Sequence, residues 1–163
     1  MAKKITMQYR RKREGRTDYK RRLTLLKSHM PRLVIRGSNK SVQAQIVIYE
    51  ADGDKVVATA RATELKKHGW ATATGNTPAA YLTGLLLAHK VKGKITEDVI
   101  IDIGLQQHHK GGRLYAVAKG AVDGGLSVRV GEETLPSDER INGSHINEKI
   151  KSQLATVKSK LVK

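Results

Sequence analysis

Apolar and polar positions alternate along three consecutive segments in the first half of the chain. The segments are "RLVIRGS" from residue 32, "SVQAQIVIYE" from residue 41 and "KVVATARAT" from residue 55. A period of two with a polar second face is typical of antiparallel strands that are half exposed to solvent. Short connections rich in Ser, Asn, Asp and Gly separate the segments, so they predict a three-stranded antiparallel meander.

The same alternation assigns the two faces of this predicted sheet. The apolar face would carry Leu33, Ile35, Val42, Ala44, Ile46, Ile48, Val56, Ala58, Ala60 and Ala62. The polar face would carry Arg32, Arg36, Gln43, Gln45, Tyr49, Lys55 and Arg61. An ordinary solvated sheet face and a binding surface are both consistent with that second set.

The second half of the chain changes to a helical period. Thr77-Pro78 predicts a helix start with Thr77 as the N-cap, and the apolar face of this helix would include Leu82, Leu85, Leu86 and His89. The nearly continuous apolar run at residues 98–105 predicts a strand that is covered on both faces. Apolar residues from Leu114 to Val122 then follow helical spacing, until the Asp-Gly-Gly at residues 123–125 ends the helix.

The predicted order of the core is therefore βββαβα. The fourth strand would lie parallel to a meander strand through a right-handed crossover. We thus expect an α/β (α+β) fold, a mixed sheet flanked by helices, within a single domain. Its parts would be a basic arm and short helix at residues 1–28, the core at residues 29–126, and a C-terminal extension at residues 127–163.

Both ends of the chain depart from this core. Residues 1–16 predict an extended, solvated arm, because they offer too little apolar surface to offset the entropy of ordering. Thr17 or Asp18 would cap a short helix to about Ser28, with a narrow apolar stripe of Tyr19, Leu23 and Leu26. A second stripe, on a Lys-rich C-terminal helix, could dock on the body or on a partner; it comprises Ile146, Ile150, Leu154, Val157 and Leu161.

The distribution of charge along the chain indicates what kind of partner the protein binds. The 163 residues carry a formal net charge of +16. Residues 1–40 hold 14 Lys or Arg against 2 Asp or Glu, whereas residues 41–163 hold 17 against 13. A basic arm on a nearly balanced body indicates a polyanionic partner, either nucleic acid or an anionic membrane surface.

Composition and the chain start narrow the class of protein further. Without cysteine the chain can form neither disulfides nor thiolate metal sites. No apolar run approaches the ~20 residues of a membrane span, and "MAKKITMQYR" lacks the apolar stretch of a secretory signal. We expect a cytoplasmic protein with no membrane contact and no small-molecule substrate.

The arm is the strongest chemical signal. Eight of the fourteen residues in "YRRKREGRTDYKRR", residues 9–22, are Lys or Arg, and Arg outnumbers Lys. Guanidinium forks bind phosphates through two hydrogen bonds, and the interleaved Tyr9 and Tyr19 offer stacking surfaces to unpaired bases. The competing interpretation is a solubilising tail. The density of arginine and the two aromatic residues favour nucleic acid.

Two glycine-bearing segments are further candidate contacts. Residues 37–40, "GSNK", form a turn whose tip could meet a phosphate, although these residue types also suit the turn itself. In "QQHHKGGR", residues 106–113, the backbone of Gly111 and Gly112 before a helix makes a natural phosphate seat, and a flexible loop is the alternative. His108-His109 lacks a nearby Cys or second His pair, so no metal is expected.

A catalytic role is disfavoured by the residues that would carry it. A βββαβα order is shared with nucleases that hold two metal ions between carboxylates, and Asp102 follows an apolar strand. However, the first strand, which should supply the central carboxylate, offers Arg32 and Arg36 instead. Neither a Cys nucleophile, a Gly-x-Ser-x-Gly motif nor a P-loop occurs, so the chain is not expected to be an enzyme.

Several segments, in one order and spacing, resemble a known family. They are "RRKREGRTDY", "PRLVIRGSNK", "AQIVIYE", "GWATATGNTPAAYLTGLL", "DIGL", "KGGRLYAVAKGAVDGGL" and "LPSDERINGSHI". The chain resembles the archaeal form of the large-subunit ribosomal protein, universal number eighteen, which binds 5S rRNA. One departure is Ser127-Val128-Arg129-Val130 after Gly125-Leu126, where the family often has Ile-Pro-His.

The resemblance implies a ribonuclease-H-like topology without the active site. It implies a structural role in the large ribosomal subunit, with 5S rRNA, large-subunit rRNA and the neighbouring ribosomal protein of the fifth universal large-subunit class as partners in the central protuberance. No cofactor or metal is implied. A general, chromatin-like nucleic-acid binder remains the alternative that charge alone would allow.

The residues, together with this resemblance, give the predicted RNA-binding set. It comprises Lys3, Lys4, Tyr9, Arg10, Arg11, Lys12, Arg13, Arg16, Tyr19, Arg21, Arg22, Arg36, Ser38, Asn39, Lys40, Gln45, Tyr49, His108, His109, Lys110, Gly111 and Arg113.

Overall fold

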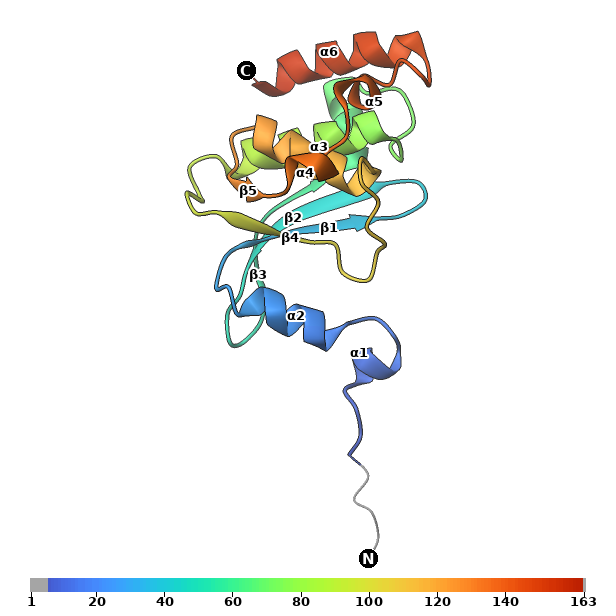
Figure 1. Ribbon diagram of the computed structural model, residues 1–163. Helices are drawn as coiled ribbons and strands as arrows, with labels where there is room; N and C mark the ends of the chain where they lie inside the picture. The colour runs from blue at the N-terminus through green and yellow to red at the C-terminus, as the bar shows by residue number, and fades with distance from the viewer. Residues whose placement is uncertain (1–5, 163) are drawn as a thin grey trace, which may run out of the picture.

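A five-stranded mixed sheet organises the computed structural model, which describes residues 6–162 (Figure 1). Its strands are β1 (Arg32–Gly37), β2 (Val42–Ile48), β3 (Lys55–Arg61), β4 (Val99–Asp102) and β5 (Val128–Arg129), in the order β3-β2-β1-β4-β5. The first three strands are antiparallel neighbours, and β4 lies parallel to β1. The predicted meander and its parallel fourth strand are therefore confirmed.

The fifth strand was not predicted. β5 contributes only two residues beside β4, in parallel, which is too short for any periodicity to be visible in the sequence. β4 is also shorter than the predicted strand at residues 98–105, because the chain turns away after Asp102 at Gly104, whose φ is +61°.

Two helices, α3 (Thr77–Val91) and α4 (Arg113–Asp123), cover one face of the sheet, and α6 (Glu148–Val162) lies outside α3 (Figure 1). A Cβ added at Gly84 would lie 2.0 Å from the carbonyl oxygen of Val117, and one at Gly120 would lie 2.0 Å from that of Tyr81. The backbones of α3 and α4 therefore touch, which only glycine allows at these two positions. Because α3 is packed between the sheet, α4 and α6, it is buried almost throughout.

Three residues near the ends of α3 and α4 differ from the sequence prediction. Asn76, not Thr77, is the N-cap of α3, since its side-chain oxygen accepts a hydrogen bond from the Ala79 amide at 2.9 Å. His89 and Val122, predicted on apolar helix faces, are exposed because both lie in the last turns, beyond the packed region.

A bulge corrects the face assignment at one end of the meander. The pairing steps from Ile46 with Ala58 to Val47 with Val56, which leaves Val57 without a direct partner. One extra residue inverts the alternation on β3, so Val56, predicted on the apolar face, is exposed. β2 keeps its register with β1, where Val47 lies opposite Arg32 on the other face of the sheet and is nevertheless buried. Ile48, also predicted on the apolar face, is exposed at the end of β2.

The N-terminal segment lies on the side of the sheet away from α3 and α4 (Figure 1). A single helical turn, α1 (Arg10–Arg13), interrupts the arm that was predicted to be extended over residues 1–16; residues 1–5 lie outside the described part. The next helix, α2 (Tyr19–Leu26), begins at Asp18, whose carboxylate accepts hydrogen bonds from the Lys20 and Arg21 amides, as predicted.

The predicted apolar stripe of α2 is wrong at Leu23, whereas Tyr19 and Leu26 are partly buried. Leu23 is 57% exposed, and the side chains of α2 that turn towards the sheet include Arg21, Arg22 and Leu25. The reason is the surface beneath the helix, which presents carboxylates and a buried arginine rather than an apolar layer.

Two 3-10 helices and two α-helices complete the body; the first follows β3 and the other three lie in the C-terminal region. These are η1 (Ala62–His68), η2 (Glu132–Thr134), α5 (Asp138–Asn142) and α6. α6 docks on the body through Ile150, Leu154, Val157 and Leu161, which are all buried. Ile146, the first member of the predicted stripe, precedes the helix and is 49% exposed. Among residues 6–162, no helix has both the length and the apolar character that a membrane span needs.

Candidate nucleic-acid interface

A buried arginine lies at the centre of the sheet face that α2 covers. Arg32, in β1, is only 2% exposed, yet it has two carboxylates within reach. Its Nη1 lies 3.0 Å from Asp102 Oδ2, and its Nη2 lies 2.7 Å from Asp54 Oδ2. A buried charge is tolerated only when it is paired, so these two aspartates are what allow Arg32 to occupy the sheet.

The same aspartates hold further arginines that point into the open. Arg36 donates from Nη1 to the Asp102 carbonyl at 2.7 Å, and its Nη2 lies 3.2 Å from Asp102 Oδ1. Asp102 Oδ1 also accepts from the Gly104 amide at 2.8 Å, which stabilises the loop after β4. Asp102 is thus occupied by two guanidinium groups and an amide.

α2 is attached to the sheet by arginine contacts. Arg22 Nη2 donates to both oxygens of Asp54 at 2.9 Å, and Arg21 Nη1 donates to the Gly104 carbonyl at 2.9 Å. Burial works to raise the pKa of Asp54, but hydrogen bonds from Arg32 and Arg22 and their charges prevail and lower it. Asp54 therefore stays ionised at neutral pH and joins α2 to β1.

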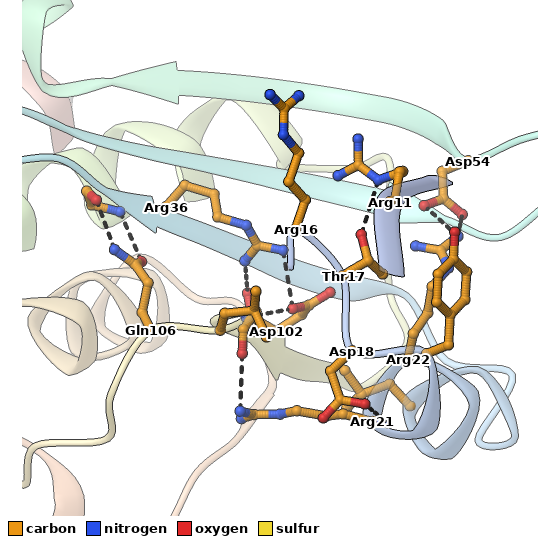
Figure 2. Close-up of a pocket in the computed structure, with 15 residues that line it drawn as sticks. Arg11, Arg16, Thr17, Asp18, Arg21, Arg22, Arg36, Asp54, Asp102 and Gln106 are labelled. Carbon is orange, nitrogen blue, oxygen red and sulfur yellow. Dashed lines mark hydrogen bonds and ion pairs between the residues drawn. The ribbon is translucent and has the colours of Figure 1, made fainter. Parts of the chain in front are cut away.

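An open cleft of about 740 Å³ lies between the arm, α2 and the sheet (Figure 2). The charged side chains that line it are Arg11, Arg16, Arg21, Arg22, Arg36, Asp18, Asp54 and Asp102. Arg11 Nε donates to the neutral Thr17 hydroxyl at 2.9 Å, and Arg11 has no carboxylate partner in the described chain. With five arginines against three aspartates, and Arg32 beneath them, the cleft keeps a net positive charge.

The two glycine-bearing segments meet beside this cleft. The Gln106 side chain pairs with the Gly37 backbone: it accepts from the amide at 2.9 Å and donates to the carbonyl at 2.6 Å. The turn at residues 38–40 is thereby placed next to the loop at residues 106–113. Because Gly37 and Gln106 also line the cleft, the arm, the cleft and both segments form one continuous surface.

Individual side chains of the 106–113 loop have different partners. Arg113 Nη1 donates to the Gly75 carbonyl at 2.8 Å, and exposed Lys110 pairs with exposed Glu133 at 3.0 Å. His108 lies between Arg21 and Tyr115. Because a guanidinium can only donate, His108 Nε2 accepts from Arg21, so Nδ1 carries the proton that is donated to the Tyr115 hydroxyl oxygen.

The remaining predicted RNA-binding residues do not all lie at the cleft. The rings of Tyr9 and Tyr19 pack against each other, with centroids 5.2 Å apart, and Tyr9 is 73% exposed. Gln45 donates to the Thr59 hydroxyl at 3.0 Å within the sheet, and Tyr49 lies past the far end of β2, away from the turn at residues 38–40. Lys3 and Lys4 lie outside the described residues.

Sequence reasoning missed Asp54, Gln106 and Thr17 as parts of this surface. Asp54 stood out only as a hairpin residue, and Gln106 as one polar residue among several. The one usable signal was Arg32, an arginine on a strand with strongly apolar neighbours, which predicts that acidic partners lie close to it.

The arrangement can hold anions, and it disfavours cations. Residues 6–162 contain no group of three or more His, Asp or Glu side chains placed to hold a metal ion. The carboxylate that a two-metal nuclease would need at the end of β4 is neutralised by Arg32 and Arg36. Guanidinium groups around an open cleft are suited to phosphate.

Comparison with known proteins identifies the family. The profile described as "Ribosomal large subunit proteins 60S L5, and 50S L18" matches residues 3–99, more than half of the chain. The chain belongs to this family. It is 46% identical over 164 residues to the "Large ribosomal subunit protein uL18" of Methanoregula boonei, with 94% of each chain covered.

Two further relatives carry the same name. The protein of Caldivirga maquilingensis is 50% identical over 141 residues, which cover 86% of this chain and 68% of the relative. That of Methanococcoides burtonii is 48% identical over 140 residues, which cover 86% of this chain and 81% of the relative. These relatives are named as ribosomal proteins and not as enzymes, in agreement with the expected lack of catalysis. The chain is therefore a protein of the large ribosomal subunit.

Proposed function

We propose that the chain binds 5S rRNA and helps to attach it to large-subunit rRNA in the central protuberance. The observation that carries the proposal is the continuous basic surface formed by the arm, the cleft and the two segments that Gln106 joins to them. We assign the predicted RNA-binding residues among residues 6–162 to this surface, with Gln45 and Tyr49 as outlying contacts. Lys3 and Lys4 stay predicted contacts outside the described residues.

Phosphates and sugars are the groups that this surface fits best. Arg11, Arg16 and Arg36 reach an open cleft from different elements, as Figure 2 illustrates. Arginine forks bind phosphate oxygens in pairs, and an RNA helix hides its base edges in a deep, narrow groove. The surface would therefore recognise the shape of the RNA backbone, while exposed Tyr9 could stack on an unpaired base.

The wider assignment follows from the same family resemblance. Its parts are a cytoplasmic location on the ribosome, contact with the neighbouring protein of the fifth universal large-subunit class, and a single domain made of arm, core and C-terminal extension. A ribonuclease-H-like topology belongs to this proposal and is supported by the order of the strands, with antiparallel β1 to β3 and parallel β4 beside β1.

The salt dependence of binding to isolated 5S rRNA tests the proposal. Each phosphate that a cationic side chain neutralises should contribute about 0.7–0.9 to the slope of log affinity against log salt. The double variant Arg11→Gln/Arg16→Gln should therefore weaken binding and flatten the slope by about 1.4–1.8. Both side chains are exposed, so the melting temperature should stay unchanged.

The matched control is Lys92→Gln/Lys94→Gln, which removes the same charge from an exposed loop away from the cleft. This control should leave the slope nearly unaltered. Equal slopes for all three proteins would show that the cleft is not where 5S rRNA binds.

A further inference from the structure

Positive charge gathers in two places along the chain, and only one of them is the arm. Residues 62–70 and 148–163 together carry seven Lys against two Glu. Residues 41–61 and 71–147, which form the rest of the body, carry 10 Lys or Arg against 11 Asp or Glu. The body is therefore nearly neutral between two basic regions. In Figure 1 the helix α6 lies at the end of the molecule opposite the N-terminal arm.

The second basic region is built from η1 and α6, which pack side by side. Lys160 Nζ lies 3.5 Å from the His68 carbonyl oxygen, and Gln153 Oε1 accepts from the Ala71 amide at 3.4 Å. Helical spacing places Lys149 in the same row as Gln153 and Lys160, on the side of α6 that faces η1. Together, Lys66, Lys67, Lys149 and Lys160 form what we term the η1–α6 lysine surface.

The charge of this surface is not balanced within the protein. All four lysines are exposed, and across residues 6–162 none of them forms an ion pair with a carboxylate. Glu64, in η1, is already held by Lys90. A solvated helix usually alternates Lys with Glu four residues apart, but α6 has one Glu and four Lys. Clustered like charges without counter-charges favour an external anion.

We propose that the η1–α6 lysine surface binds the phosphate backbone of a second RNA segment, so that one chain bridges two RNA segments from opposite ends. The exposed positions of α6 are Lys, Ser, Thr and Ala with a single Glu, and they lack the aromatic and apolar anchors of a protein-binding surface. Lysine is a compact point charge that contacts phosphate without reading bases. The bridge rests on the proposed function, in which the arm and the cleft bind the first RNA, whereas the contact of the lysine surface with RNA does not depend on it.

A capture assay with two RNAs tests the bridge. The full-length protein is captured on immobilised 5S rRNA, and a fluorescent 20-base-pair RNA duplex of arbitrary sequence is then added. The captured protein should bind the duplex. The variants Lys149→Gln/Lys160→Gln and Lys66→Gln/Lys67→Gln should each flatten the salt dependence of duplex capture by about 1.4–1.8, while 5S rRNA capture is unchanged.

The control Lys92→Gln/Lys94→Gln should capture the duplex as well as the unaltered protein does. Equal duplex capture by the control and by both lysine-surface variants would overturn the proposal. A second assay measures the binding of polyglutamate to the same proteins. If the lysine-surface variants lose polyglutamate binding but keep duplex binding, the proposal is also overturned, because the surface would then be a contact for an acidic protein. If the immobilised 5S rRNA captures no protein, the proposed function fails. The second site is then tested separately, by the fluorescence anisotropy of the duplex mixed with the same variants in solution.

Discussion

The two faces of strand β1 differ in what they bury and in how they are held. On one face, Leu33 and Ile35 are fully buried under α3 and α4. On the other, Arg32 is equally buried but is surrounded by carboxylates, and Arg36 reaches the cleft. The first face stabilises the fold through apolar burial and close packing. The second positions α2 and the arm through ion pairs, so folding and the proposed RNA binding depend on different sides of one strand.

Among the substitutions considered, truncating a buried residue on the apolar face should reduce stability most. Leu87, in α3, is fully buried, and Leu87→Ala should lower the free energy of unfolding by ~2–5 kcal/mol. The same change at Leu23, on the opposite side of the molecule and 57% exposed, should cost no more than ~0.5 kcal/mol. Urea unfolding of both variants measures this. Similar losses for the two variants would contradict the assignment of the core to the α3 side.

A smaller loss is expected when the buried arginine is removed. Arg32→Met leaves Asp54 and Asp102 without their shared partner, but Arg22 and Arg36 remain beside them. The cost should therefore lie below the ~3–5 kcal/mol typical of a broken buried pair, at about 2 kcal/mol. Calorimetric unfolding tests this, and proteolysis within residues 14–28 should quicken because Asp54, which binds Arg22 of α2, is no longer held by Arg32. A variant as stable and as resistant as the parent protein would show that the ion network does not hold α2.

The stability that the ion pairs of the charged face contribute should depend on pH, unlike the apolar burial on the other face. Burial opposes the ionised form of Asp54, but Arg32 and Arg22 lower its pKa below the ordinary 3.8. The stabilising contribution of ionised Asp54 is then complete above that value, and it is lost as pH falls through the lowered pKa of the folded state. The stability difference between the parent protein and Asp54→Asn should thus be constant from neutral pH to about pH 4 and shrink below it.

Asp52→Asn is the control, since Asp52 is exposed in the same hairpin and makes no ion pair among the described residues. The stability difference between the parent protein and Asp52→Asn should not shrink comparably below pH 4. A stability difference for Asp54→Asn that began to shrink well above pH 4 would mean that the carboxylate is not held as described.

The smallest effect expected from the charged face is catalytic, and it should be nil. Two-metal hydrolysis needs free carboxylates that bring ions ~3.5–4 Å apart, whereas Asp102 is neutralised by two arginines. The purified protein with millimolar magnesium or manganese should leave RNA–DNA hybrids and 5S rRNA intact. Metal-dependent cleavage that disappears in Asp102→Asn would restore the nuclease interpretation.

The apolar face was the more predictable of the two. Periodicity placed Leu33, Ile35, Val42 and Ala44 correctly, because a period of two follows directly from strand geometry. It failed at Val56, because one extra residue on β3 inverts the alternation there without leaving a trace in composition. The two residues of β5 were too few to show any period.

The charged face was predictable in composition but not in arrangement. Charge density alone identified the arm, and glycines before a helix identified residues 106–113. The orientation of α2 depends on Asp54 and Asp102, which lie far from it in the sequence and meet Arg32 only in the folded sheet. The pairing of Gln106 with Gly37 likewise depends on strand register, which a single sequence does not encode locally.

Crosslinking from assembled large ribosomal subunits, mapped to both peptides and RNA positions, tests the central claim most directly. If the charged face of the sheet carries the RNA contact, crosslinks to 5S rRNA should concentrate in peptides from residues 9–22 and 104–113. Crosslinks to 5S rRNA that avoid both segments and arise elsewhere on the chain would contradict the account.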